Sequence, residues 1–164
     1  MSPTPTANRY GSAVVELPSE TDIRVTRAFD AAAESVFAAL TTPELVKRWW
    51  GSEKMSWKVC DIDLRAGGTW RFVVRYRLLK IAFHGAYTEV DAPRRLVQTE
   101  AIEGAPEAAT GLTTIELDEA DGVTTMTVLS QYRSREIRDR MIGQGNNDGL
   151  QTSYNRLEDV LRAG

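Results

Sequence analysis

The sequence has little of what most metal sites and nucleophilic sites require. Cys60 is the only cysteine and His84 the only histidine among 164 residues. A single thiol excludes an internal disulfide and a cluster of metal-binding thiolates, and a single imidazole excludes a site with two histidine ligands. We therefore expect no metal and no cofactor, and the range of chemistry open to the chain is narrow.

Two further shortages concern partners and location. No apolar run approaches the roughly 20 residues of a membrane-spanning helix, so we expect no membrane insertion. The chain has 20 basic and 23 acidic residues, a formal net charge of −3, whereas proteins that hold nucleic acid usually have a clear basic excess. The first residues do not read as a secretory signal either. We expect a cytoplasmic protein that binds no nucleic acid.

What is present fits one globular domain. Hydrophobic residues make up 42% and charged residues 26% of the chain, which is typical of globular proteins, and the length suits one core. Prolines at positions 3, 5 and 18 predict a flexible leader over residues 1–20. The remaining residues, 21–164, are predicted to form a single domain.

Periodicity predicts the order of the elements. Residues 23–29 alternate with period two and predict a first strand, and two short helices follow it, the second starting at Thr42-Pro43. Short turns between the strands that come next predict an antiparallel meander. These strands are expected at residues 57–64, 70–77, 81–90, 94–102, 110–118 and 123–132.

The C-terminal stretch from Ser134 to Leu161 has helical periodicity. Glycines and asparagines gather at 143–149, and each disfavours a helix by up to about 1 kcal/mol relative to alanine. The sequence therefore predicts either one bent helix or two helices in tandem, and it leaves open whether the helix continues through 143–149.

This order of elements requires the C-terminal helix to cover one face of the sheet. The face that we expect to be inward carries large aromatic side chains and methionines, which often line apolar ligand pockets. On the residues alone, however, an aromatic stripe on a strand is more often solid core than a pocket. The candidate lining residues are Trp49, Trp70, Phe72, Val74, Tyr76, Phe83, Tyr87, Met126, Val128, Met141 and Tyr154.

Glu89 is the candidate for acid–base chemistry. It is in phase with Phe83 and Tyr87, so on an inward face it would place a carboxylate in an apolar wall, where burial raises the pKa. Such a group could act as a general acid or base, or anchor a polar group of a ligand. The alternative is a solvent-exposed glutamate, or one that pairs with an arginine such as Arg71.

Four other positions receive simpler interpretations. Gln98 and Glu100 share a strand face with Leu96, which leaves open a polar patch on the same wall. His84 is out of phase with that face and is expected on the other side of the sheet. Cys60 has no cationic neighbour in its strand and is expected to be an unreactive thiol.

Several segments together resemble a known family. They resemble the START-like SRPBCC proteins of bacteria, in the group similar to the C-terminal domain of the activator of the heat-shock-protein-90 ATPase (AHSA-like). The resemblance covers about residues 20–163. The segments that carry it are RAFDA at 27–31, RWWG at 48–51, DLRAGGTWRF at 63–72, HGAYTEV at 84–90, PRRLV at 93–97 and the ending 149–161.

The resemblance implies an α+β helix-grip fold. In this fold a curved seven-stranded antiparallel sheet surrounds a long C-terminal helix, two short helices follow strand one, and a cavity lies between sheet and helix. The implied function is binding of a hydrophobic or aromatic small molecule, lipids included. Because one fold hosts unrelated roles, a cyclase- or dehydratase-type enzyme with a buried carboxylate and a cochaperone-like stress protein stay as alternatives.

The alternatives are not equally supported by the residues. The chain lacks a recognisable nucleophile, metal ligands and a nucleotide-binding motif, so we favour binding over catalysis. Members of the family commonly have a glycine-containing turn where this chain has Leu78 and Leu79. Exposed leucines at a loop tip would suit a subunit contact or the lip of a cavity, and a homodimer through this turn or a sheet edge is left open.

Overall fold

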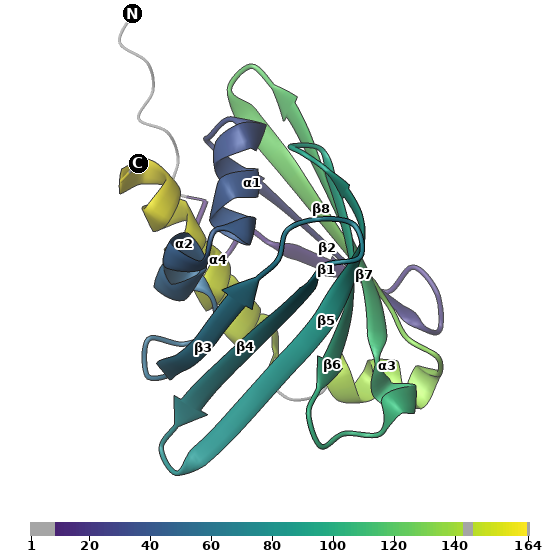
Figure 1. The fold of residues 1–164 in the computed structure, drawn as a ribbon. Coiled ribbons are helices and arrows are strands. Elements are labelled where there is room, and N and C mark those ends of the chain that lie inside the picture. Colours follow the sequence, from purple (N-terminus) through teal and green to yellow (C-terminus); the bar gives the residue numbers. More distant parts are fainter. Residues whose placement is uncertain (1–8, 143–145, 164) are drawn as a thin grey trace, which may run out of the picture.

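The computed structural model describes residues 9–142 and 146–163 (Figure 1). From Asp22 onward, its strands and helices follow one another in the order that the periodicity predicts. In chain order they are β1 Val14–Glu16, β2 Asp22–Phe29, α1 Ala33–Thr41, α2 Pro43–Trp49, β3 Ser56–Ile62, β4 Thr69–Tyr76, β5 Leu79–Asp91, β6 Arg95–Ile102, a 3-10 turn Glu107–Ala109, β7 Gly111–Ala120, β8 Val123–Gln131, α3 Arg135–Ile142 and α4 Asn146–Ala163.

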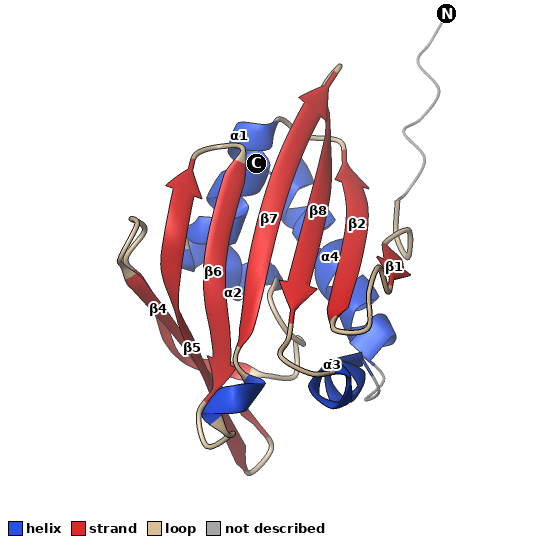
Figure 2. Cartoon of the chain, turned by 90° about the vertical axis from the view of Figure 1, so that its right-hand side faces the viewer, coloured by secondary structure: helices blue, strands red, loops and turns tan. Residues whose placement is uncertain are grey.

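One antiparallel sheet holds the strands in the order β1-β2-β8-β7-β6-β5-β4-β3. The sheet curves around α4, and α1 and α2 lie on the same side as α4 (Figure 1). We call this side the inner face. In the described part of the chain the opposite face has no covering helix, and α3 lies beyond the sheet end at which β6 and β8 finish (Figure 2). The α+β helix-grip fold is confirmed.

The strand count differs from the expected seven because the sheet has eight strands. The additional strand is β1, which pairs with β2 through Val14↔Thr26 and Val15↔Val25. It lies in the segment for which the sequence predicts a flexible leader, where three residues are too few to show a period. Two adjacent β-branched residues favour strand pairing at this place. The division into a leader and one domain stays a prediction.

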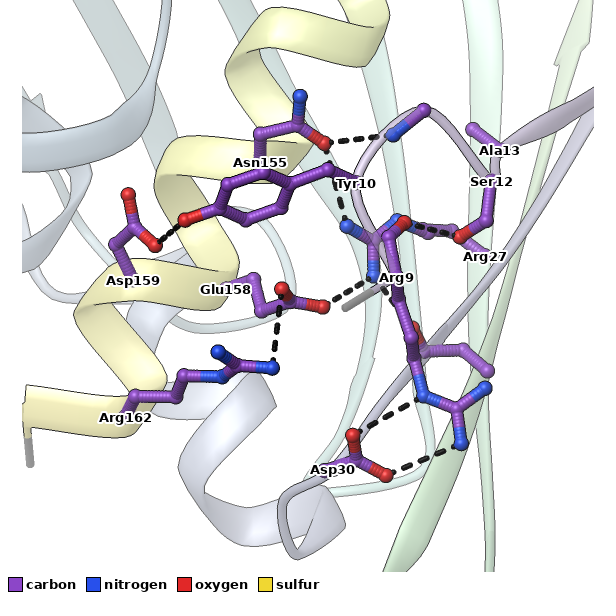
Figure 3. A network of polar contacts seen from close by, with 12 residues as sticks. Arg9, Tyr10, Ser12, Ala13, Arg27, Asp30, Asn155, Glu158, Asp159 and Arg162 are labelled. Atoms are coloured by element: carbon purple, nitrogen blue, oxygen red, sulfur yellow. Dashed lines mark hydrogen bonds and ion pairs between the residues drawn. The ribbon is translucent and has the colours of Figure 1, made fainter. Parts of the chain in front are cut away.

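Residues 9–13, which we call the N-terminal segment, lie before β1 and against α4 (Figure 3). The guanidinium of Arg9 donates to Asp30 at 3.1 Å, and the hydroxyl of Tyr10 donates to Asp159 on α4. The backbone amide of Gly11 donates to the Asn155 side chain at 3.0 Å. The N-terminal segment therefore connects the end of β2 with α4.

A buried ion pair joins β2 to α4 directly. The Arg27 guanidinium donates to Glu158 at 3.0 Å, and both side chains are at most 2% exposed. Nε of Arg27 has no hydrogen-bond partner, and Oε2 of Glu158 is 3.4 Å from Arg162 without a hydrogen bond. The pair is therefore only partly satisfied, although each charge has the other as a counterion (Figure 3).

α4 is also fixed to the end of α2. Ser153 and Arg156 donate to the carbonyl oxygen of Gly51 at 3.1 and 2.9 Å, and Arg156 donates to that of Arg48 at 3.0 Å. Carbonyl groups at a helix C-terminus lack intrahelical partners and attract cations. Gly51 has a φ of +76°, which disfavours other residues there. These contacts give a structural role to the RWWG motif at residues 48–51 and to Ser153 and Arg156 of α4.

The C-terminal stretch forms two helices in tandem, α3 and α4. The separation agrees with the predicted weakness at 143–149. Residues 143–145, on which the question of continuity depends, lie outside the described residues.

The closed part of the core lies under α1 and α2. Phe29, Val36 and Leu157 are fully buried there, and Met126 is 1% exposed. Burying side chains of this size contributes roughly 1.5–3 kcal/mol each. This half of the interior is therefore solid core, as the residues alone suggested.

Candidate functional site

The inner face of the sheet changes character along its strands. Next to the closed core, the register aligns an apolar row made of Val90, Leu96, Ile115 and Val128. The adjacent row is polar apart from the ring of its tyrosine and consists of Tyr87, Gln98, Thr113 and Ser130. Farther along β6, Glu100 lies opposite Gly111 of β7. The polarity of the inner face thus rises toward the end of the sheet near α3.

Glu100 is the acidic group of this region. Its Oε1 accepts a hydrogen bond from Nε2 of Gln98 at 3.1 Å. Burial raises the pKa of Glu100, and hydrogen bonds from Gln98 and Thr113 oppose that increase only in part. The pKa is raised because the protein interior solvates the charged carboxylate of Glu100 less well than water does.

Tyr132 and Tyr154 bring two phenols near Glu100 from different elements. Burial raises the pKa of Tyr132 to about 12, assisted by the negative charge of Glu100 and opposed by a hydrogen bond with Ser130. Burial also raises the pKa of Tyr154, again assisted by Glu100 and opposed by Arg27. Both phenols therefore stay protonated at neutral pH. We call Gln98, Glu100, Thr113, Ser130 and Tyr132 the polar cluster.

Gly111 makes room for this arrangement. A Cβ at position 111 would lie 2.6 Å from the ring of Tyr132, so the ring packs directly on the glycine backbone. Any larger residue would displace Tyr132 from Ser130 and Glu100.

The interior near the polar cluster is less closed than the core under α1. Glu100, Tyr132 and Tyr154 are half-buried, as are the apolar Ile115 and Val128 on the same inner face. The groups with raised pKa therefore combine two properties: they are withdrawn from bulk water, and their side chains keep accessible surface.

Aromatic rings form the neighbouring wall on β3, β4, β5 and the end of α2. The Trp50 ring centroid lies 5.1–5.5 Å from those of Trp57, Phe72 and Phe83. The Trp70 indole is 4.8 Å from Phe72. These separations are typical of favourable edge and tilted ring contacts. Trp50, Trp57 and Phe83 are half-buried, so the wall is partly accessible.

Trp70 lies across β5 rather than beside it. Its Nε1 donates to the carbonyl oxygen of Thr99 on β6 at 3.2 Å. This crossing requires Gly85, because a Cβ there would lie 1.8 Å from the Thr99 oxygen and 2.5 Å from Nε1. The pairs His84↔Ala101 and Tyr87↔Gln98 place Gly85 opposite Glu100, so the indole lies next to the polar cluster.

The predicted lining residues fall into two groups by exposure. The buried group is Trp49, Trp70, Phe72, Val74, Tyr87 and Met126, and the half-buried group is Tyr76, Phe83, Val128, Met141 and Tyr154. Their common role as the lining of a ligand site stays a prediction.

The structure brings some of these residues together and separates others. Trp49 and Tyr154 have ring centroids 6.3 Å apart, so α2 and α4 meet through them. Tyr76 instead lies at the tip of the β4–β5 hairpin, where it lines an open hollow with Arg77, Leu78 and Leu79. Met141 is on α3, beyond the end of the sheet.

Of the two interpretations of Glu89, the exposed glutamate paired with an arginine agrees with the structure, and the inward-facing carboxylate does not. A β-bulge between Tyr87 and Glu89 shifts the register from Tyr87↔Gln98 to Glu89↔Val97, so the two residues no longer share a face. The Glu89 side chain is exposed and forms an ion pair with Arg95. The inward carboxyl belongs to Glu100, for which the period of β6 from Leu96 onward was the available signal.

The remaining candidates agree with their interpretation. His84 is exposed. Burial raises the pKa of the Cys60 thiol to about 11, so the thiol is protonated at neutral pH and is a poor nucleophile. The sequence interpretation missed Trp57, Thr113, Ser130 and Tyr132, because their meeting depends on the pairing of β6, β7 and β8 and on the position of α2.

The residues that the structure describes lack two features, a membrane-spanning helix and a metal-binding cluster. None of their helices is both long and apolar enough to cross a membrane. The same residues contain no group of three or more histidine, cysteine, aspartate or glutamate side chains arranged to hold a metal ion.

Comparisons with known proteins agree with the architecture. The family model described as "Activator of Hsp90 ATPase homolog 1-like protein" matches residues 30–162. No curated protein matches the chain.

Solved structures show the same fold. A protein from Rhodobacter sphaeroides superposes with a TM-score of 0.87 and 24% identity over 93% of this chain and 99% of that one. A protein from Mycobacterium smegmatis has a TM-score of 0.82 with 21% identity over 93% and 98% of the two chains. One from Nitrosomonas europaea has 0.79 with 25% identity over 90% and 98%.

Proposed function

Because the chain belongs to the Activator of Hsp90 ATPase homolog 1-like family, whose fold is commonly a ligand-binding scaffold, we propose that it binds a hydrophobic or aromatic small molecule. The proposed site lies between α4 and the inner face of the sheet, from the apolar row at Ile115 and Val128 to the polar cluster. The aromatic wall of β3–β5 forms its side. Sites of this kind combine apolar walls with a few polar groups that orient the ligand.

One observation carries the proposal. Glu100 and Tyr154 face each other from β6 and α4, burial raises the pKa of both, and both residues are only half-buried. We infer that they line a space between the sheet and α4. Apolar neighbours such as Val128 would make such a space favourable for an apolar molecule.

A second candidate function is an enzyme of the cyclase or dehydratase type. It is favoured by Glu100, a carboxyl with a raised pKa beside the phenols of Tyr132 and Tyr154. Groups with such pKa shifts are suited to proton transfer. If turnover of a bound ligand is detected, Glu100→Gln should reduce kcat strongly, and unchanged kcat in this variant would reject the enzyme assignment.

Binding is tested with N-phenyl-1-naphthylamine, an uncharged aromatic dye that fluoresces in apolar surroundings. We expect saturable binding of one dye molecule per chain. Ile115→Trp adds volume to the inner face and should abolish binding. Leu112→Trp, on the exposed side of the same strand, is the matched control and should bind like the wild type.

Both variants need a stability measurement, because overpacking costs roughly 1–3 kcal/mol. Circular dichroism melting establishes that each is folded at the assay temperature. The proposed function is rejected if the wild type binds no dye, or if folded Ile115→Trp binds it as well as the wild type does.

A further inference from the structure

Glu100 has polar partners but no countercharge. The groups facing it are Gln98 and Thr113 on the sheet, Tyr132 after β8 and Tyr154 from α4. In the described part of the chain none of these is a cation. The buried carboxylate of Glu158, by contrast, forms an ion pair with Arg27.

The described residues include two buried arginines, and both are already engaged. Arg138 donates to Asp139 at 2.8 Å and to the carbonyl oxygen of Ser19 at 2.7 Å. Arg27 donates to Glu158 at 3.0 Å and to the carbonyl oxygen of Ala28 at 2.7 Å. Its guanidinium also stacks 4.7 Å from the centre of the Phe29 ring. Moving it to Glu100 would leave the buried Glu158 with only the exposed Arg162, at 3.4 Å, as a counterion, which is unfavourable for a buried charge. Among the described residues, therefore, neither buried arginine is available to pair with Glu100.

We infer that Glu100 is the polar anchor of the ligand and that the site selects an apolar molecule with one basic nitrogen over the same molecule with a carboxylate. This inference rests on the proposed function. An ammonium group brings the missing positive charge, so the occupied site is electrically neutral. A carboxylate ligand would bring a second negative charge next to Glu100.

The surroundings of Glu100 favour an ammonium group in two further ways. Protonated Tyr132 and Tyr154 each have an oxygen that can accept a hydrogen bond, and a primary ammonium has three N–H donors. The Trp70 indole lies beside Thr99, the residue before Glu100, and donates to its carbonyl oxygen at 3.2 Å, and aromatic rings attract cations rather than anions.

The test uses ligands that share an apolar body and differ in one group. The probes are dodecylamine, dodecanol and dodecanoate, together with 2-naphthylmethylamine, 2-naphthylmethanol and 2-naphthoate. Each displaces N-phenyl-1-naphthylamine at pH 7, below its micelle concentration. For each body we expect the amine to bind about 10- to 100-fold more tightly than the alcohol, the range for a hydrogen bond with a charged partner. The carboxylate should bind most weakly.

Variants connect this order to one residue. In Glu100→Gln the amine should lose its advantage and bind like the alcohol, while the affinity for the alcohol changes less than about threefold. Glu103→Gln is the matched control, since its carboxylate is at the surface and pairs with Arg71 at 3.1 Å. It should keep the wild-type order.

The outcomes separate the two claims. If alcohols bind but the amine has no advantage, or if Glu100→Gln keeps that advantage, the role of Glu100 is rejected and the binding function stands. If neither the dye nor any of the six probes binds, both are rejected. Should Glu100→Gln fail to fold, the order of the three groups on the wild type still decides, because a carboxylate that binds as tightly as the amine overturns the inference.

Discussion

Glu100 places an ionisable group where its charged form is poorly solvated. Its pKa in the folded protein is raised, first by burial, with smaller opposing effects from Gln98 and Thr113. A group of this kind binds its proton more tightly in the folded state than in the unfolded state. Its contribution to stability is therefore complete at pH values below the pKa of the unfolded chain and is lost as the pH rises through the raised pKa.

Replacing the carboxyl by its neutral amide should reverse this loss. We expect Glu100→Gln to be more stable than the wild type at pH 8 and equally stable near pH 4, because the wild-type carboxyl is protonated at the lower pH. Urea unfolding at pH 4, 6 and 8 measures the difference. Glu103→Gln serves as the control and should change stability by less than about 1 kcal/mol, as exposed ion pairs do. A difference between wild type and Glu100→Gln that does not change with pH would contradict the raised pKa.

Single residues also show which features could not be predicted from the sequence. The alternation of β5 predicts the inner face correctly for Tyr87 and incorrectly for Glu89, because a β-bulge lies between them. The sequence at the bulge has no glycine or other turn residue from which it could be predicted. Glu100 shares a face with Leu96 in the pattern of β6, but its burial depends on Tyr132, which β8 brings across the sheet. Contacts between distant strands are not visible in a local period.

Among the elements, β2 and α4 depend on one buried ion pair. Arg27 and Glu158 are 131 residues apart in the chain and 3.0 Å apart in the fold. The polar contacts of this pair extend to Arg162 on α4, which lies 3.4 Å from Glu158. They also reach Asn155, whose side-chain oxygen accepts hydrogen bonds from Arg27 and from the backbone amide of Gly11 in the N-terminal segment (Figure 3). Removing Glu158 leaves Arg27 as a buried charge without its carboxylate, and removing Arg27 leaves Glu158 with only the exposed Arg162 as a counterion. Replacing both by apolar residues leaves surface that can repack.

A double-mutant cycle tests this pair. We expect Glu158→Leu and Arg27→Met each to lower the free energy of unfolding by about 3–5 kcal/mol, the cost of breaking a buried pair. The double variant Arg27→Met with Glu158→Leu should lose less than either single variant. Urea denaturation gives all three values, and Glu136→Gln, in an exposed pair with Arg140, should lose about 0.5 kcal/mol or less. Additive losses would show that the two charges do not depend on each other.

The local sequence pattern determines most helices and strands, but it does not determine how they are arranged in the fold. The alternation in β2 and β4 and the helical period of α4 predict those elements within a few residues. β1 was missed because Val14–Glu16 gains its structure only by pairing with β2. The placement of β2 beside β8 was not predicted, because no periodicity encodes which strands are neighbours.

At the scale of the molecule, the sheet ends at two blunted edges. β1 has three residues, and β3 has a register shift between Trp57 and Val59. Short or irregular edges resist pairing with another chain. A homodimer stays a prediction, and the exposed leucines of the β4–β5 hairpin, with Leu78 93% exposed, are a better location for it than either edge.

The interior as a whole has a solid half under α1 and an accessible half toward α3, and ligand binding should couple to the stability of both. A ligand that binds only the folded state at 100 times its dissociation constant adds about 2.7 kcal/mol to the free energy of unfolding. For a domain of this length each kcal/mol raises Tm by about 2–4 °C, so we expect N-phenyl-1-naphthylamine at that ratio to raise Tm by about 5–10 °C. Differential scanning calorimetry measures the shift. Leu112→Trp should show the same shift and Ile115→Trp none, and a shift of wild-type size in Ile115→Trp would place the dye outside the space between the sheet and α4.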